Sequence, residues 1–369
     1  MKRFITAVIV FLIGCVPAVA FAAKAAEESA APVRGKYLAG RGIIIPPDEI
    51  YIDSYIGYID YNYPKPDEDF GVTLYAGHRQ VSSRGQEEVL QIGIQGRELD
   101  FEELPPMNLA FVIDKSGSMS DRDKMDWVKE SFYIFIEKVR DIDYVSLIVF
   151  DSDARVVFPS TVMNTAKKRE DFKRSVRSIQ PGGGTNLVKG LELGYKEVLS
   201  NYRREYTNRV LFLTDGIGES GGIIEMARVY RRMGINVSTI GVGKDFDLHL
   251  MRELGQKGGG SSRFISGREE MEETFGSELD RMVVPIAYDL DMKLEFLQDV
   301  RILGTWGYDH RIQGSTVHYY LPTLHHRDYE TILASVWIPL LDAAGEKDLL
   351  RFSLTYSDAG GNRRSAGPY

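Results

Sequence analysis

Five side chains that could do chemistry carry oxygen as their only polar atom, and an α/β fold would bring them together. Asp114 ends a strongly apolar segment and is followed by Ser116 and Ser118, and Asp215 ends a second such segment. Thr185 lies between them in a glycine-rich run. Carboxylate and hydroxyl oxygens are the ligands of hard cations such as magnesium, and no histidine or cysteine accompanies them to favour zinc. The chemistry that these residues could do is therefore the binding of a divalent cation.

Each of these residues also has a purely structural interpretation. Asp114 and Ser116 could cap a helix that begins near Asp121, because Asp and Ser are common capping residues. Thr185 and Asn186 could likewise cap the helix that follows them. Capping is the more common use of any one of these residues taken alone. Taken together, the five residues occur in an order that resembles that of a known family, and this resemblance favours the metal site.

The elements that must position these residues alternate between strands and helices from about residue 108 to 284. Apolar, β-branched runs suited to strands buried on both faces occur at 109–113, 145–150, 210–214 and 236–242. Helical stripes of apolar residues lie between them, at 128–139, 187–198 and 223–230. A further run, 155–158, could be an antiparallel edge strand. Such alternation predicts a doubly wound, mainly parallel α/β sheet, and both aspartates then end strands at the edge where such sheets bind ligands.

The run Asp114-Lys115-Ser116-Gly117-Ser118, the distant Thr185 and the pair Asp215-Gly216 together resemble one family. They match the D-x-S-x-S, T and D-G elements of the metal-ion-dependent adhesion site (MIDAS) of von Willebrand factor type A (VWA) domains. The resemblance covers about 108–284, roughly half of the chain. The elements are individually common but jointly specific, and the fold that the resemblance implies is the Rossmann-like one predicted above.

By this resemblance, the hydroxyls of Ser116, Ser118 and Thr185 contact the metal, while Asp114 and Asp215 often act through water. The carboxylate of a partner protein then completes the coordination shell. The expected cofactor is Mg²⁺, with Mn²⁺ or Ca²⁺ as alternatives. Position 115 departs from the family pattern, because its lysine stands where an uncharged residue is common. We expect side-chain alternation to point Lys115 away from Ser116 and from the cation.

Strand-like segments without helices flank this domain on both sides. An N-terminal region, 46–106, begins with a tyrosine-rich stretch at helical spacing and continues with strand-like runs at 71–75 and 88–93. A β-rich C-terminal domain, 285–369, contains strand-like runs at 290–296, 315–321, 331–338 and 350–356. We expect these N- and C-terminal strands to form a β-sandwich into which the VWA domain (107–284) is inserted. The tyrosine-rich stretch is also similar to the region preceding the VWA domain in bacterial exported proteins.

The first 22 residues have the charged, apolar and cleavable order of a secretory signal peptide. Two readings of this segment remain open: cleavage at Ala20-Phe21-Ala22, or a lipobox around Cys15, which would then be lipidated. Cys15 is the only cysteine, and either reading explains a lone thiol in an oxidising compartment. Residues 23–45 are expected to be a tether. The predicted location is the periplasm or cell surface, with a membrane anchor if Cys15 is acylated.

Several other functions find little support in the sequence. A net charge of −8 argues against nucleic-acid binding. The G-x-G-x-x-G run at 216–221 follows Asp215 and contains Glu219, and these two acids would repel a pyrophosphate. None of the six histidines lies near Ser116 or Ser118 in sequence, so no base accompanies a nucleophile, and the protein is not expected to be an enzyme. The pair His325-His326 is expected in an exposed loop.

The expected function is therefore metal-dependent protein binding, in adhesion or scaffolding at the bacterial cell envelope. The partner would offer an acidic side chain to the metal. Two alternatives belong to other classes: an envelope hydrolase that uses the metal to activate water, and a structural VWA module whose site is unused.

Overall fold

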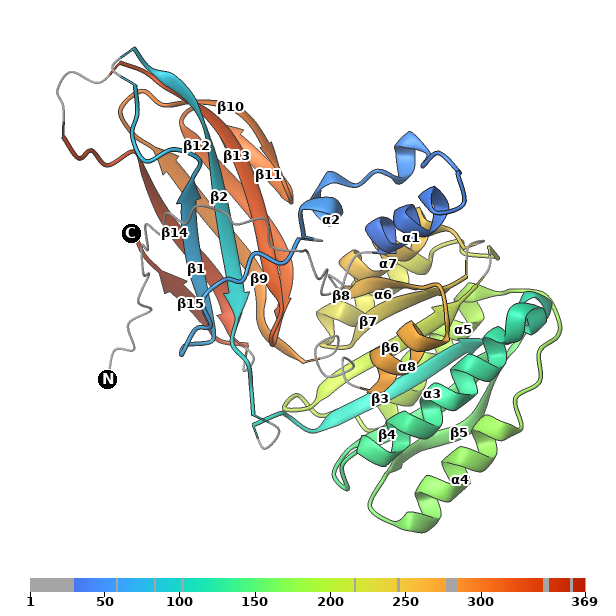
Figure 1. The fold of residues 1–369 in the computed structure, drawn as a ribbon. Coiled ribbons are helices and arrows are strands. Elements are labelled where there is room, and N and C mark those ends of the chain that lie inside the picture. Colours follow the sequence, from blue (N-terminus) through green and yellow to red (C-terminus); the bar gives the residue numbers. More distant parts are fainter. Residues whose placement is uncertain are drawn as a thin grey trace. The chain divides into compact units, whose positions relative to one another are not determined.

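The computed structural model describes residues 30–57, 59–82, 84–100, 103–215, 217–243, 246–276, 284–340, 345–358 and 361–368. The chain divides into two compact units (Figure 1). An α/β unit contains Glu28–Ile50 and Phe101–Val284, and a β unit contains Tyr51–Asp100 and Pro285–Tyr369. The signal peptide predicted at 1–22, including Cys15, lies outside the described residues. Within the described ranges, no helix is both long and apolar enough to cross a membrane.

The α/β unit is built on a six-stranded sheet in the order β5-β4-β3-β6-β7-β8. All neighbouring strands are parallel except β5, which pairs with β4 in the antiparallel direction, as predicted for an edge strand. The doubly wound, mainly parallel sheet predicted from the sequence is confirmed. The strands are β3 (Met107–Asp114), β4 (Tyr144–Phe150), β5 (Ala154–Val162), β6 (Thr207–Thr214), β7 (Asn236–Val242) and β8 (Gly259–Ile265).

Helices cover both faces of this sheet, and side chains alternating along β3 show why. Phe111 packs against rings of helices α3 and α8. Its neighbour Val112 points to the other face, where a Cβ atom on Gly194 of α5 would lie 2.4 Å from it. One face carries α3 (Lys124–Lys138), α4 (Ala166–Arg177) and α8 (Arg268–Gly276), and the other α5 (Leu187–Ser200), α6 (Ile223–Arg232) and α7 (Leu248–Lys257) (Figure 1).

The tether predicted over 23–45 is instead helical at α1 (Ala30–Ala39), which packs against β8. Its small buried residues allow close approach, and Tyr37 meets the ring of Phe264 edge-on at 5.9 Å. Arg34 forms an ion pair with Glu49, 2.8 Å from Nε to Oε2. The apolar residues of this helix are not gathered on one face, which explains why the sequence suggested a tether: small buried residues and the Arg34 ion pair contribute to its packing.

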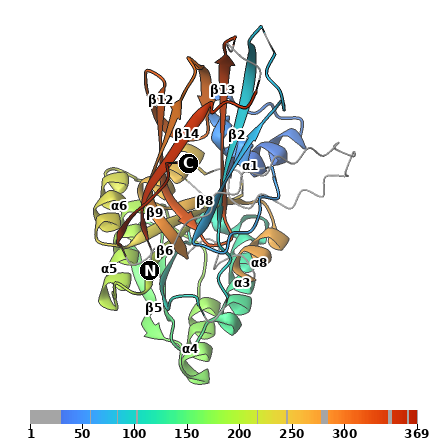
Figure 2. The same cartoon turned by 90° about the vertical axis from the view of Figure 1, so that its left-hand side faces the viewer.

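The β unit is a sandwich of two antiparallel sheets, as predicted. One sheet has the order β1-β2-β13-β10 and the other β11-β12-β9-β14-β15. A single apolar core joins them, with Ile92 and Ile94 from the first sheet and Met292 and Leu294 from the second. Figure 2 shows strands of both sheets, among them β2 and β13 of the first and β12 and β14 of the second. The strands are β1 (Phe70–Ala76), β2 (Gln86–Gly96), β9 (Pro285–Phe296), β10 (Arg301–Trp306), β11 (Asp309–Gln313), β12 (Thr316–His325), β13 (Tyr329–Ile338), β14 (Leu350–Asp358) and β15 (Arg363–Ala366).

One local expectation about the β unit is confirmed in part and another is wrong. The tyrosine-rich stretch contains the helix α2 (Ile52–Gly57), which is shorter than expected and follows a 3₁₀ turn (Pro47–Glu49) of the α/β unit. The pair His325-His326 is buried, with 4% and 1% of each residue exposed, where an exposed loop was expected. The cause is that β12 extends through His325, and the backbone N–H of Leu99 donates to Nδ1 of His326 at 3.3 Å. The two rings therefore belong to the interior of the β unit.

Candidate metal centre

The two aspartates of the candidate site are placed by neighbouring strands. β3 ends at Asp114 and β6 ends at Thr214, directly before Asp215, and the two strands run parallel with Ile113 opposite Leu213. The carboxyl ends of parallel strands meet at one edge of a sheet, so the two carboxyl groups lie close together. Both residues are buried, with exposed fractions of 0% and 1%. Only a hydrogen-bonded or paired carboxylate is tolerated at such depth.

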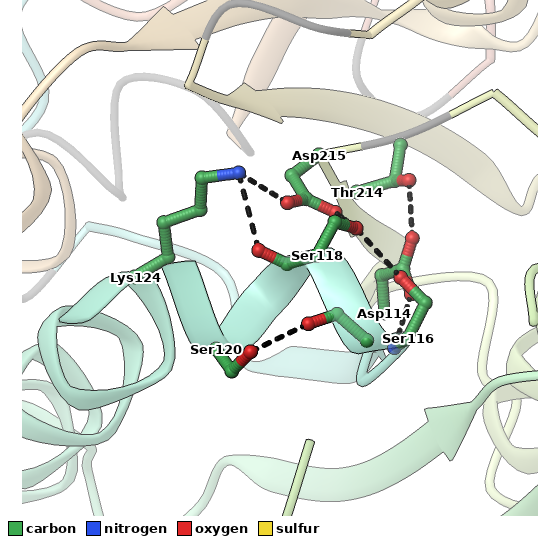
Figure 3. Close-up of polar contacts among 8 residues, drawn as sticks. Asp114, Ser116, Ser118, Ser120, Lys124, Thr214 and Asp215 are labelled. Atoms are coloured by element: carbon green, nitrogen blue, oxygen red, sulfur yellow. Dashed lines mark hydrogen bonds and ion pairs between the residues drawn. The ribbon is translucent and has the colours of Figure 1, made fainter. Parts of the chain in front are cut away.

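Hydrogen bonds connect four of the five predicted residues, through their side chains and through the backbone N–H of Ser116 (Figure 3). The backbone N–H of Ser116 donates to Oδ1 of Asp114 at 2.8 Å. The Ser116 and Ser118 hydroxyls lie 3.1 Å apart, and the Ser118 hydroxyl donates to Oδ1 of Asp215 at 2.8 Å. Residues 101 positions apart in the chain thus share one continuous hydrogen-bond network. The hydroxyl of Thr214 extends it by donating to Oδ2 of Asp114 at 2.6 Å.

The electrostatic state of Asp114 follows from its surroundings. Burial raises the pKa of its carboxyl above the ordinary value. Hydrogen bonds from Thr214 and Ser116 oppose this by stabilising the charged form, while the nearby Asp215 raises the pKa further. The carboxyl therefore carries an uncompensated cost of burial, which a bound cation would relieve.

Thr185 reaches the same edge through its backbone. Its loop contacts the serine loop, where the N–H of Gly117 donates to the carbonyl oxygen of Gly183 at 3.2 Å. On its other side, the N–H of Glu219 donates to the carbonyl oxygen of Thr185 at 3.2 Å. A Cβ atom at Gly218 would lie 2.4 Å from that oxygen, so this approach requires glycine. In the part of the chain that the structure describes, no hydrogen bond joins the Thr185 hydroxyl to the other four side chains.

Helix capping does not account for the site serine. Ser116 precedes the 3₁₀ turn Gly117–Asp123, but its side chain makes no capping hydrogen bond. Asn186 does cap α5, since its side chain accepts from the backbone N–H of Lys189 at 3.0 Å. The cap of α5 is thus Asn186, and the hydroxyl of Thr185 is not needed for it.

Two lysines near the site have different roles. The ammonium of Lys115 points away from the serines and forms an ion pair with Asp151, and it also donates to the carbonyl oxygen of Gly182 at 3.2 Å. Sequence alternation predicted that orientation. Lys124, which sequence reasoning missed, forms a buried ion pair with Oδ2 of Asp215 (Figure 3). Its position at the start of α3, after the serine loop, was the available signal.

The donor set suits a hard divalent cation. Two carboxylates and three hydroxyls offer oxygen alone, which magnesium, manganese and calcium prefer. Within the described residues, no group of three or more His, Cys, Asp or Glu side chains could hold a metal. The hydroxyls of Ser116, Ser118 and Thr185 would therefore have to supply part of the coordination, and the raised pKa of Asp114 marks a carboxyl that a cation would stabilise.

The fold and this set of oxygens define a doubly wound α/β domain with a candidate cation site at its ligand-binding edge. The family model of the von Willebrand factor type A domain matches residues 108–276. This segment of the chain belongs to the VWA family, whose domains commonly mediate protein interaction and adhesion.

Relatives and a solved structure agree with this assignment. The chain is 25% identical to the uncharacterized protein YfbK of Escherichia coli K12, over 69% of this chain and 46% of that protein. It is 29% identical to human inter-alpha-trypsin inhibitor heavy chain H3, over 43% of this chain and 19% of that protein. The chain thus spans less than half the length of these relatives. A von Willebrand factor type A structure from Catenulispora acidiphila shares the fold, with a TM-score of 0.57 and 19% identity over 84% of this chain and 74% of that one.

Proposed function

We propose that the VWA domain binds a divalent cation, Mg²⁺ first among the candidates, through Asp114, Ser116, Ser118, Thr185 and Asp215. The observation that carries the proposal is the hydrogen-bond network in which Ser116, through its backbone N–H and its hydroxyl, and Ser118, through its hydroxyl, bridge two buried carboxyl groups at neighbouring strand ends. The network brings two carboxyl groups and two hydroxyls close together, and oxygen ligands of this kind are the ones that hard cations prefer. A cation would relieve the repulsion between the acids and the cost of their burial.

The cation would in turn bind an acidic side chain of a partner protein. The five predicted ligands include only two charged groups, so a divalent ion held by them retains affinity for a further carboxylate. This supports a role in metal-dependent adhesion or scaffolding, without catalysis. Residues 1–22 have the charged, apolar and cleavable segments of a signal peptide, which supports export to the periplasm or cell surface. An acyl group on Cys15 would add a membrane anchor there.

The test is a calorimetric titration of Mg²⁺ into the mature protein and into Ser116→Ala. We expect the variant to bind at least about tenfold more weakly, because it loses one direct ligand while the fold stays intact. Ser120→Ala is the matched control, since Ser120 lies in the same turn but its hydroxyl donates to the carbonyl oxygen of Gly117. Identical heats for wild type and Ser116→Ala would remove the site from the function and leave a structural module.

The partner is tested separately by asking what the mature protein retains from an envelope extract in Mg²⁺ and releases with EDTA. Asp114→Ala should retain none of it. Retention that is unaffected by EDTA and by this substitution would place partner binding elsewhere on the protein. Metal-dependent turnover of an envelope substrate by the isolated protein would instead favour the hydrolase.

A further inference from the structure

Lys124 carries a positive charge into the interior of the candidate metal centre. It is the first residue of α3, and only 6% of it is exposed. Its ammonium contacts Oδ2 of Asp215, whose side chain is fully buried, and it makes a longer contact of 3.4 Å with the carbonyl oxygen of Ser118 (Figure 3). The two oxygens of Asp215 are thus divided, with Oδ1 facing the Ser118 hydroxyl and Oδ2 facing the lysine.

The surrounding chain leaves room for this ammonium. Gly243 has a φ of 78°, a conformation that favours glycine, and a Cβ atom there would lie 2.9 Å from Cε and 3.3 Å from Nζ of Lys124. A side chain at position 243 would therefore push the lysine out of its place. The ion pair is enclosed by the fold, so it retains its charge effect better than a pair exposed to solvent and salt.

The charges that lie together at the site can be counted directly. Two carboxylates, Asp114 and Asp215, and one ammonium, Lys124, leave one net negative charge in the metal-free site. A divalent cation added to these groups gives one net positive charge. Without the lysine, the same cation would leave the site neutral. The lysine therefore repels the cation and, once the cation is bound, adds attraction for an anion.

We propose that Lys124 tunes the ligand preference of the site: it weakens binding of the divalent cation and strengthens binding of a partner carboxylate to the loaded site. This inference rests on the proposed function, since it concerns the same site. It assigns Lys124 as a specificity-determining residue that acts through Asp215 and through its own charge. Opposite shifts for cation and anion distinguish this role from general damage to the site, which would weaken both.

The test compares wild type with Lys124→Met in calorimetric titrations with Mg²⁺ alone. We expect the variant to bind Mg²⁺ about tenfold or more tightly, because removal of one unit charge from a buried site changes the affinity of a divalent ion by at least that factor. Lys138→Met is the matched control, since it removes the same charge from the exposed, far end of the same helix. It should leave the affinity within about twofold of wild type, because exposed and distant charges are screened.

The anion is tested with ¹³C-acetate as the probe. Each protein is saturated with Mn²⁺, and paramagnetic relaxation of the acetate carbon reports its binding to the loaded site. We expect Lys124→Met to bind acetate about threefold to tenfold more weakly than wild type and Lys138→Met. If the variant holds Mg²⁺ no tighter than wild type, or binds acetate equally well, the inference is overturned.

A second substitution and a second measurement guard against the possibility that Lys124→Met is simply unstable. Lys124→Gln removes the charge but keeps a donor for Asp215, and it should show the same opposite shifts. The rise in melting temperature on adding Mg²⁺ should be larger for both variants than for wild type, because ligand stabilisation follows affinity. If wild type binds Mg²⁺ and the variants bind it no more tightly than wild type, this inference fails but the proposed function does not. If neither wild type nor variants bind Mg²⁺, the proposed function and this inference fall together.

Discussion

The candidate metal centre has two halves that are built by different means. The buried half is built on the buried residues Asp114, Ser116 and Asp215, and hydrogen bonds through the exposed Ser118 complete the link between the two strand ends. The exposed half is the loop 182–185, which is half-buried at its ends and is held by backbone hydrogen bonds and by the Lys115 ammonium. The buried half thus couples the site to the stability of the α/β unit, whereas the exposed half can shift without disturbing the core. Substitutions in the two halves should therefore separate stability from metal affinity.

The largest effect on stability is expected in the buried half, from Thr214→Val. The hydroxyl of Thr214 donates to the buried carboxyl of Asp114 at 2.6 Å, and hydrogen bonds to charged groups contribute about 1.5–3 kcal/mol. The measurement is urea unfolding of the metal-free protein, followed by circular dichroism. Thr239→Val is the control, because Thr239 is equally buried in β7 but donates to a neutral carbonyl oxygen, that of Met251, at 2.8 Å. If both variants lose the same free energy of unfolding, the Asp114 carboxyl does not act as a charged acceptor for Thr214.

An intermediate effect is expected in the exposed half, from Gly218→Ala. The new Cβ atom would lie 2.4 Å from the carbonyl oxygen of Thr185, so the loop that carries Thr185 must move. Steric insertions of this kind cost about 1–3 kcal/mol, and an exposed loop that can yield lies at the low end. We expect Mg²⁺ affinity in calorimetry to fall by about tenfold or more while the unfolding midpoint changes little.

Gly221→Ala is the matched control for that substitution. Gly221 belongs to the same glycine-rich segment, but a Cβ atom there meets nothing within 4 Å. Its Mg²⁺ affinity should equal that of wild type. A Gly218→Ala protein that binds Mg²⁺ as wild type does would show that the position of Thr185 is not required, and the site would reduce to the buried half.

The same division between the halves explains how much the sequence could predict. Asp114 and Asp215 were predictable because each lies at the end of a buried strand, and the carboxyl ends of parallel strands meet at one edge. The role of Lys124 was missed, although the residue comes soon after the site serines, because the charged run Asp121–Lys124 looks like solvated surface until the 3₁₀ turn folds it inward. The contribution of Gly218 was hidden as well, because periodicity carries no information on which glycine must approach a distant carbonyl oxygen.

The same limits apply to the fold. Strands with continuous apolar runs were predicted because burial on both faces dictates their composition. Strand β8 was missed, since its first residues are Gly259-Gly260-Ser261-Ser262, which look like a turn. Helix α1 was missed because small residues and Arg34 hold it in place without an apolar stripe. Tertiary contacts determine both elements, and the local sequence does not reveal them.

The smallest effect is expected from Lys115→Ala, which removes the ion pair on the exposed side of the site. Hydrogen bonds from the Lys115 ammonium and from the backbone N–H of Asp153 lower the pKa of the Asp151 carboxyl. A depressed pKa in the folded state stabilises the protein above the pKa of the unfolded carboxyl, and that stability is lost as pH falls through the folded value. Lys115→Ala should therefore lower the free energy of unfolding by about 0–1 kcal/mol at pH 7. This difference from wild type should vanish at low pH, where the Asp151 carboxyl is protonated.

Urea unfolding as a function of pH tests this, with Lys189→Ala as the control for a pair that is more exposed. Lys189 pairs with Asp153 at 3.1 Å, and both side chains are at least half exposed. Since Lys115 also donates to the carbonyl oxygen of Gly182, its loss should weaken Mg²⁺ binding by a few-fold, which Lys189→Ala should not. If the stability lost in Lys115→Ala persists at low pH, the effect of the substitution comes from packing of the aliphatic stem of Lys115. Uncharged contacts would then hold the exposed half in place.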